Sequence, residues 1–225
     1  RELAVAMLFH DIGMIFLPDG LMQKSEPLTP EELTAAQQHP HTGFEHLVGS
    51  QAISSVSANL ILRHHELLNG TGYPQRIGGE KLSLLTRIAS VVEAYDSLTT
   101  PRFGVPAVLP DVAVSYLLAN AGKLFAKEAV VALCRRIALY PQGTAVKLNT
   151  GECGIVAGVL ATAPMRPVVL VQIDHRGKPL KEPLIVDLTC DAGRNVVRSA
   201  ANLQLLLQTQ EPEATPIHPV YANLG

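Results

Sequence analysis

The sequence predicts a mainly α-helical bundle followed by a small antiparallel β subdomain. Apolar residues recur three or four positions apart through the first two thirds of the chain, which is the period of a helix. From Pro141 the pattern changes to short β-branched runs separated by Gly, Asn and Asp. We therefore expect a helical domain over residues 1–140, a β-rich extension over 141–207 and a loose, proline-rich tail over 208–225.

Glycines and prolines divide the helical part. The first helix is expected over residues 1–11, ended by Ile12-Gly13 and followed by a loop. Thr29-Pro30-Glu31-Glu32 predicts the start of the next helix, because it combines an N-cap threonine, a proline at the first position and a glutamate that completes a capping box. We expect Pro40 and Gly43 to break or bend that helix, and another to run from about residue 50 to 65.

Three further helices and a group of strands are expected after residue 80. One helix ends at Thr99, with its apolar face formed by Leu84, Ile88, Val91, Tyr95 and Leu98. Asp111 suits an N-cap for a helix over 112–121, and a last amphipathic segment covers 126–140. The predicted strands lie in the runs "TAVKL", "GIVAGVL", "RPVVLVQI" and "PLIVDL".

Composition excludes several classes of partner. The 225 residues are 47% hydrophobic and 17% charged, with a net charge of -2 and no tryptophan. We therefore do not expect electrostatic binding to a nucleic-acid polymer. The most apolar stretch, residues 154–173, is interrupted by Pro164, Arg166 and Pro167, so no membrane span is expected.

Cysteine usage and the start of the chain suggest a fragment of a cytoplasmic protein. The three cysteines are scattered without a disulfide or metal spacing, so we expect buried free thiols in a reducing compartment. Helical spacing already begins at Leu3, and we expect further domains or an anchor to precede Arg1.

Histidines and carboxylates form an ordered series along the helical part. The clusters are spaced 25 to 28 residues apart, so each falls on a different helix or helix end, and facing helices can direct them into one cavity. A lone histidine is usually structural, and His41, His46, His175 and His218 are interpreted so. Mixed imidazole and carboxylate ligands suit iron, manganese or zinc, and a pair of such ions supports phosphoester hydrolysis. The clusters are His10-Asp11, His39, His64-His65-Glu66, and Glu93 with Asp96.

These motifs together resemble a known family. "HDIG", "HPHTG", "HHELLNGTGYP" and "RIASVVEAYDSLT" occur in the order and spacing of the HD-GYP domain, the helical metal-dependent phosphodiesterase of cyclic di-GMP in the HD superfamily. The resemblance covers about residues 1–140. The stretch "YPQGTAVKLNTGECGIV" also resembles a C-terminal extension of some members.

The resemblance implies a di- or trinuclear centre, usually of iron or manganese, and hydrolysis of cyclic di-GMP to linear pGpG and in some cases GMP. It also implies GGDEF-domain proteins as partners and is compatible with a homodimer. His10 and Asp11 would be catalytic, and Glu66, Asp96 and Arg87 would support the site, Arg87 by pairing with a carboxylate. Gly72, Tyr73, Pro74 and Arg76 would shape the substrate pocket. The implied metal ligands are His10, Asp11, His39, His64, His65 and Glu93.

Three positions depart from the family pattern. Met14 replaces a lysine expected to face phosphate, and Glu93 replaces an aspartate ligand. Asn69 replaces the aspartate that begins the family's "DGTGYP" motif, which here reads "NGTGYP". A thioether supplies no charge, so Met14 predicts a slower enzyme unless Lys24, Arg63 or Arg76 supplies the cation. Two alternatives stay open: a degenerate module that binds cyclic di-GMP or a GGDEF partner without hydrolysis, and a phosphohydrolase of other nucleotides.

Overall fold

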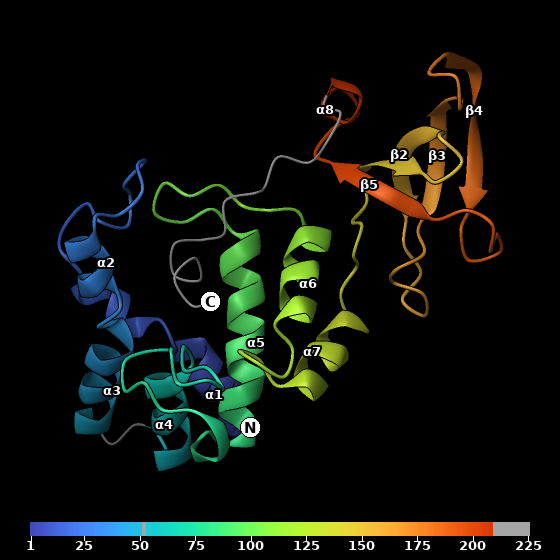
Figure 1. Ribbon diagram of the computed structural model, residues 1–225. Coiled ribbons are helices and arrows are strands. Elements are labelled where there is room, and N and C mark those ends of the chain that lie inside the picture. Colours follow the sequence, from blue (N-terminus) through green and yellow to red (C-terminus); the bar gives the residue numbers. More distant parts are fainter. Residues whose placement is uncertain (51–52, 209–225) are drawn as a thin grey trace. The chain divides into compact units, whose positions relative to one another are not determined.

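The computed structural model describes residues 1–50 and 53–208, which form two compact units. One contains Arg1–Ala107 and Tyr116–Val131, and the other contains Val108–Ser115 and the described residues from Ala132 onward. Helices followed by a five-stranded antiparallel sheet confirm the predicted fold class (Figure 1). The domain boundary near Pro141 stays a prediction.

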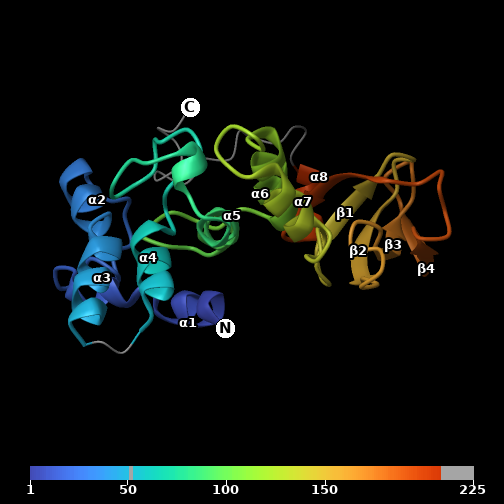
Figure 2. The ribbon, with the colours of Figure 1, turned by 90° about the horizontal axis from the view of Figure 1, so that it is seen from below.

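The helical unit is built around α4, which packs against both α1 and α3 (Figure 2). The longest helix, α5, packs against α1 and α4. A short 3₁₀ helix, η1, follows α1 and lies against α3. The bounds are α1 (Glu2–Phe9), η1 (Ile12–Phe16), α2 (Pro30–Ala36), α3 (His39–Ser50), α4 (Ser55–Arg63) and α5 (Leu84–Thr99).

Capping side chains decide where these helices begin. Thr29 and Glu32 form the predicted capping box at the start of α2. The prediction of a helix from residue 50 was wrong at its start, because Ser54 caps α4 by accepting the N–H of Ser57. Pro40 does not interrupt a helix either; it stands in the first turn of α3, where its missing N–H needs no partner. The break lies before it, at residues 37–38.

The buried face of α5 differs from the predicted apolar face. Val91 and Leu98 are buried, but Leu84 is 70% exposed and Ile88 and Tyr95 are only half-buried. Small and polar side chains complete the buried face instead, because this side of the helix faces a polar centre. They are Thr86, Ala89, Ser90, Glu93, Ala94 and Ser97.

The last two helices of the first 140 residues are α6 (Pro110–Ala119) and α7 (Lys127–Cys134), and both end earlier than predicted. Asp111 lies inside the first turn of α6 rather than capping it, and its Oδ2 accepts a hydrogen bond from Ser199 Oγ at 2.7 Å. The chain turns after α7, where the N–H of Arg136 donates to the carbonyl of Leu133, so the helix does not continue to Tyr140.

The sheet has the strand order β4-β3-β2-β1-β5, with every pair antiparallel (Figure 1). The four predicted strands are confirmed, while the fifth strand and a final helix were missed. One face of the sheet holds a core of Val146, Leu148, Val156, Val169, Val171, Val186 and Leu188, and the final helix covers Ala145 and Cys153 on the other through Leu206. The bounds are β1 (Ala145–Leu148), β2 (Cys153–Gly158), β3 (Val168–Ile173), β4 (Pro179–Asp187), β5 (Val196–Ala200) and α8 (Leu203–Gln208).

Other expectations have mixed outcomes. All three cysteines are free, but only Cys153 is buried; Cys134 is half-buried and Cys190 is exposed, so the prediction of buried thiols was wrong for these two. Within the described part of the chain, no helix has the length and apolar character that a membrane crossing requires. The predicted tail lies outside the described residues from position 209 onward, and so does His218.

Candidate metal centre

Asp11 lies between α1 and η1, and the small size of Gly13 allows His39 to lie beside it. A Cβ on Gly13 would lie 1.9 Å from the carbonyl oxygen of His39 and 2.8 Å from the amide nitrogen of Gly43. Only glycine therefore allows η1 and α3 to come this close. The close approach brings the first residue of α3, His39, beside Asp11.

Three histidines of the site are oriented in the same way. Each has its Nδ1 within 2.8 Å of the carbonyl oxygen three residues earlier in the chain. A carbonyl oxygen can only accept, so Nδ1 carries a proton, and in the neutral imidazole Nε2 keeps a lone pair that can bind a metal ion. The pairs are His10 with Met7, His39 with Ala36, and His64 with Ile61.

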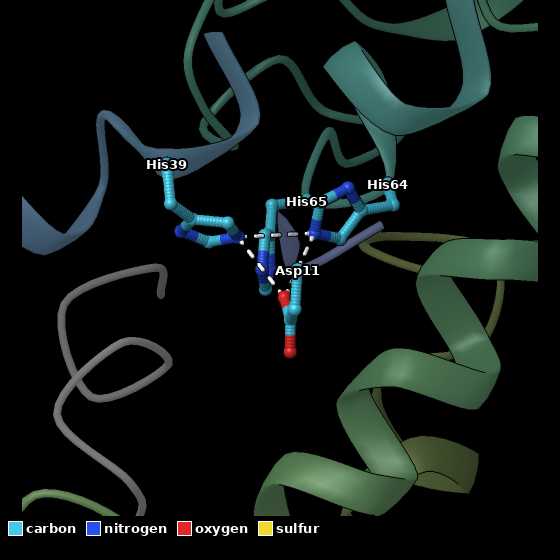
Figure 3. Close-up of side chains that lie close together, drawn as sticks. All are labelled: Asp11, His39, His64 and His65. Carbon is cyan, nitrogen blue, oxygen red and sulfur yellow. Dashed lines mark hydrogen bonds and ion pairs between the residues drawn. The ribbon is translucent and has the colours of Figure 1, made fainter. Parts of the chain in front are cut away.

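Asp11, His39, His64 and His65 form what we call the four-residue cluster (Figure 3). Each contributes one possible ligand atom, and these atoms lie within 4.8 Å of one another. Asp11 Oδ1 is 3.2 Å from His39 Nε2 and 3.7 Å from His64 Nε2. All three histidines are buried, while the Asp11 side chain is 29% exposed. The cluster is thus open to solvent on the side of Asp11.

The donor set of this cluster fits a metal ion. The Nε2 atoms of His39 and His64 are 3.2 Å apart with their lone pairs facing each other, and Nε2 of His65 is buried without a hydrogen-bond partner. Burial lowers the pKa of His64, and it lowers the pKa of His65 well below the usual value, so extra protons are disfavoured. Burial alone would raise the pKa of Asp11, but the imidazoles of His39 and His64 beside its Oδ1, together with His10, outweigh burial and keep the carboxylate ionised. A divalent cation satisfies all four groups.

His10 and Glu93, here called the His10–Glu93 pair, lie on the other oxygen of Asp11. His10 Nε2 is 3.3 Å from Asp11 Oδ2 and 3.2 Å from Glu93 Oε2. Burial would raise the pKa of Glu93, but the hydrogen bond with His10, the neighbouring His64 and the hydroxyl of Ser97 together outweigh burial and lower it. Burial would lower the pKa of His10, but the hydrogen bond with Glu93 and the charges of Glu93 and Asp11 together raise it. Ser97 Oγ holds the remaining Glu93 oxygen at 2.7 Å.

Arg102 reaches this centre and was missed by the sequence analysis. Its Nη1 is 3.7 Å from Asp11 Oδ2 and 3.4 Å from Glu93 Oε1, and its Nη2 is 2.6 Å from Asp96 Oδ2. An arginine in a loop after α5 has no periodicity that marks it. The only available signal was its place just beyond the helix that carries Glu93.

The cations proposed to compensate for Met14 make other contacts. Lys24 pairs with Glu32 at 2.5 Å, and Arg63 donates to Gln75 and Asn59. Arg76 is exposed. Among the described residues, these three form no hydrogen bond or ion pair with the four-residue cluster, whereas Arg102 contacts Asp11. That one of the three supplies charge to a bound phosphate stays a prediction.

Comparison with known proteins identifies the family. Residues 1–128 match the HD domain, and residues 145–206 match a KOW domain associated with the HD domain. The chain belongs to the HD domain family. This confirms the predicted resemblance, and the match ends close to the last helix of the helical part.

This HD domain has curated relatives with assigned names. It is 31% identical over 188 residues to a cyclic di-GMP phosphodiesterase of Pseudomonas aeruginosa, covering 84% of this chain and 45% of the relative. It is 36% identical over 170 residues to the cyclic di-GMP phosphodiesterase response regulator RpfG of Xanthomonas campestris pv. campestris, covering 75% of this chain and 42% of the relative. The chain thus spans less than half the length of these relatives.

A solved structure is also similar to this HD domain. It is an HDG"Y"P protein from Bdellovibrio bacteriovorus, 26% identical, with a TM-score of 0.48. The similarity covers 59% of this chain and 42% of that chain.

The loop over residues 69–78 of the HD domain, rich in glycine and here called the Gly/Pro loop, packs against the histidines. A Cβ on Gly72 would lie 2.4 Å from the carbonyl oxygen of His65, so the loop backbone packs directly on the cluster. The Tyr73 ring stacks on the His65 ring at 4.4 Å, and a cis peptide bond joins Tyr73 to Pro74. These residues therefore form a wall of the centre.

Three supporting residues of the HD domain act differently from their implied roles. Glu66 does not contact the histidines, since its carboxylate accepts the N–H groups of Gln75 at 2.7 Å and Ile77 at 3.0 Å and so holds the loop. Arg87 has no carboxylate partner among the described residues; it donates to the carbonyls of Leu82 and Gly79, at the short 3₁₀ helix η2 (Gly79–Lys81). The side chain of Asp96 contacts Arg102 and Thr100 among the described residues, and so it supports the site through Arg102.

Asn69 preserves the turn of the loop. Its Oδ1 accepts the N–H of Thr71 at 3.1 Å and the hydroxyl of Thr71 at 2.7 Å. An aspartate would accept the same two bonds, so this departure from the family pattern leaves the loop intact.

Proposed function

We propose that this HD domain is a metal-dependent phosphodiesterase that hydrolyses cyclic di-GMP to linear pGpG. The observation that supports it is the convergence of the imidazoles of His39, His64 and His65 with Asp11 in one cluster, while His10, paired with Glu93, contacts the second oxygen of Asp11. Both curated relatives described above are named as cyclic di-GMP phosphodiesterases, which favours this substrate.

The residues that would hold metal follow from these contacts. Asp11, His39, His64 and His65 would bind one ion, and His10 and Glu93, with the second oxygen of Asp11, offer a second position. Mixed nitrogen and oxygen ligands favour iron or manganese over magnesium or calcium. A bound divalent ion supplies charge to a phosphoryl oxygen and lowers the pKa of water.

The chain itself would bind and orient the substrate. A cleft of about 390 Å³, within the usual range of ligand pockets, lies beside the centre and includes Arg102 and Lys24. Two cations at one cleft suit a dinucleotide with two phosphodiesters, and a guanidinium can bind phosphate through two hydrogen bonds. The leaving 3′-oxygen would take its proton from water that enters past the exposed edge of Asp11.

A matched pair of histidine variants tests this function. The chain is purified without oxygen, its iron and manganese are measured, and linear product is followed from cyclic di-GMP. We expect His39→Gln to lose metal and at least about 10²-fold of the rate. His41→Gln, two residues along the same helix and 50% exposed, should retain both. Metal and turnover left unchanged in His39→Gln would contradict the proposal.

A second candidate function is a receptor that binds cyclic di-GMP without hydrolysis. It is favoured by Met14, which supplies no charge, and by Arg102, which occupies the carboxylates of the His10–Glu93 side. A metal-free protein that binds the dinucleotide and forms no linear product would support it. Met14→Lys distinguishes the cause, since a rise of about 10²-fold in rate would assign the deficit to the missing lysine. GGDEF partners, a homodimer and a cytoplasmic location stay predictions.

A further inference from the structure

We propose that Arg102 keeps the His10–Glu93 side of the centre from taking a metal ion, so that the resting chain binds a single ion at the four-residue cluster. This inference rests on the proposed metal centre and concerns how many ions it holds. On this proposal, the guanidinium of Arg102 provides the positive charge that a second metal ion would otherwise provide.

The contacts of the guanidinium support this. Nη1 lies 3.7 Å from Asp11 Oδ2 and 3.4 Å from Glu93 Oε1, so one fixed positive charge already faces both carboxylates on that side. Both carboxylates are ionised groups with lowered pKa values, and the Glu93 side chain is 2% exposed. An ion bound between them would lie only a few ångströms from the guanidinium, and like charges repel strongly in a buried site.

Arg102 is also held in place. Its Nη2 pairs with Asp96 at 2.6 Å, and its backbone exchanges two hydrogen bonds with Val105, at 3.2 Å and 2.9 Å. The side chain is 23% exposed. Because one end of the guanidinium is anchored to Asp96 and the loop backbone is closed by Val105, the positive charge cannot withdraw without breaking these contacts.

The four-residue cluster has no such competitor. Its ion pairs involve Asp11 Oδ1, whereas the Arg102 contact is with Oδ2. Among the described residues, Arg102 forms ion pairs with Asp11, Glu93 and Asp96 and with none of the three histidines of that cluster. One ion can therefore bind to the imidazoles and Oδ1 while Arg102 stays where it is.

Manganese titration of the metal-free chain tests the inference, with free Mn²⁺ measured by electron paramagnetic resonance. We expect the wild type to bind one Mn²⁺ per chain at concentrations at which Arg102→Gln binds two, because the variant's second position gains at least about tenfold in affinity. Arg102→Lys keeps the charge and should still bind one. Arg135→Gln, an exposed arginine beyond α7, is the matched control and should also bind one.

If Arg102→Gln fails to fold, Asp96→Asn serves instead, because it removes the outer anchor and should also strengthen the second site. Two ions of equal affinity in the wild type and in Arg102→Gln would overturn the inference, and so would a single ion in both. In those cases turnover of cyclic di-GMP by the wild type would leave the proposed function standing. No manganese in any variant would overturn the metal centre itself.

Discussion

Gly13→Ala should disrupt the centre without changing any side chain that belongs to it. The added Cβ would lie 1.9 Å from the carbonyl oxygen of His39, and real Cβ contacts essentially never fall below 3.0 Å, so η1 and α3 must separate by at least about 1.1 Å. Overpacking of this kind costs about 1 to 3 kcal/mol in the free energy of unfolding. A displacement near 1 Å also costs about 10²-fold in rate, because it moves Asp11 away from His39.

The assay for Gly13→Ala combines urea unfolding, manganese content and hydrolysis of cyclic di-GMP. Gly49→Ala is the matched control, since Gly49 lies in α3, the helix against which Gly13 packs, and its Cβ would have no heavy atom within 4 Å. We expect Gly49→Ala to be neutral or to stabilise the chain by up to about 1 kcal/mol through helix propensity, with metal binding retained. If Gly13→Ala unfolds at the wild-type urea concentration and binds manganese as before, the close approach of η1 and α3 does not position Asp11.

Three further outcomes are expected. In the metal-free chain, the pKa values of His64 and His65 are lowered, so below pH 6.5 the unfolded chain binds protons that the folded chain does not. The free energy of unfolding should therefore fall as the pH drops below 6.5, by up to about 1.4 kcal/mol per pH unit for each histidine. Urea unfolding between pH 7.5 and 5.5 measures this, and the slope should shrink in His65→Gln; the raised pKa of His10 acts in the opposite direction. Glu66→Gln should lose about 1 to 3 kcal/mol and speed hydrogen exchange of the loop amides, since an amide NH₂ would face a backbone N–H. Asn69→Asp should leave the free energy of unfolding within about 0.5 kcal/mol of the wild type, measured in urea.

Local signals in the sequence were enough to predict much of the fold. The capping box at Thr29 marked the start of α2, because its two hydrogen bonds depend only on residues three positions apart. The strands were also predicted from a local signal, because β-branched runs between turn residues can be recognised within a few positions of the chain. The face of α5 was not predicted well, because helical periodicity follows apolar side chains. The buried side of α5 carries Glu93 and Ser97, whose burial depends on partners from distant parts of the chain.

The candidate site was also predictable where local sequence was enough and unpredictable where contacts between distant segments decide. The residue types and order of His10-Asp11, His39 and His64-His65 indicated a metal centre, and the structure brings four of these residues together. The sequence could not say that Asp11 presents its two oxygens to different neighbours, since that depends on how η1 meets α3. It also gave no reason to choose Arg102, which becomes relevant only when the loop after α5 folds back toward Asp11.

The departures from the family pattern do not have equal weight once their contacts are known. Asn69 makes the turn that an aspartate would make, and Glu93 still directs a carboxylate oxygen to His10 at 3.2 Å. Met14 removes a positive charge from the family pattern, and Arg102 is a cation that contacts both Asp11 and Glu93. A cation held by carboxylates is less available to a phosphate than a free lysine, because binding substrate would have to break existing ion pairs. The rate of this HD domain should therefore depend on whether the phosphodiester can compete with Asp11 and Glu93 for Arg102, which is a question of substrate binding rather than of missing metal ligands.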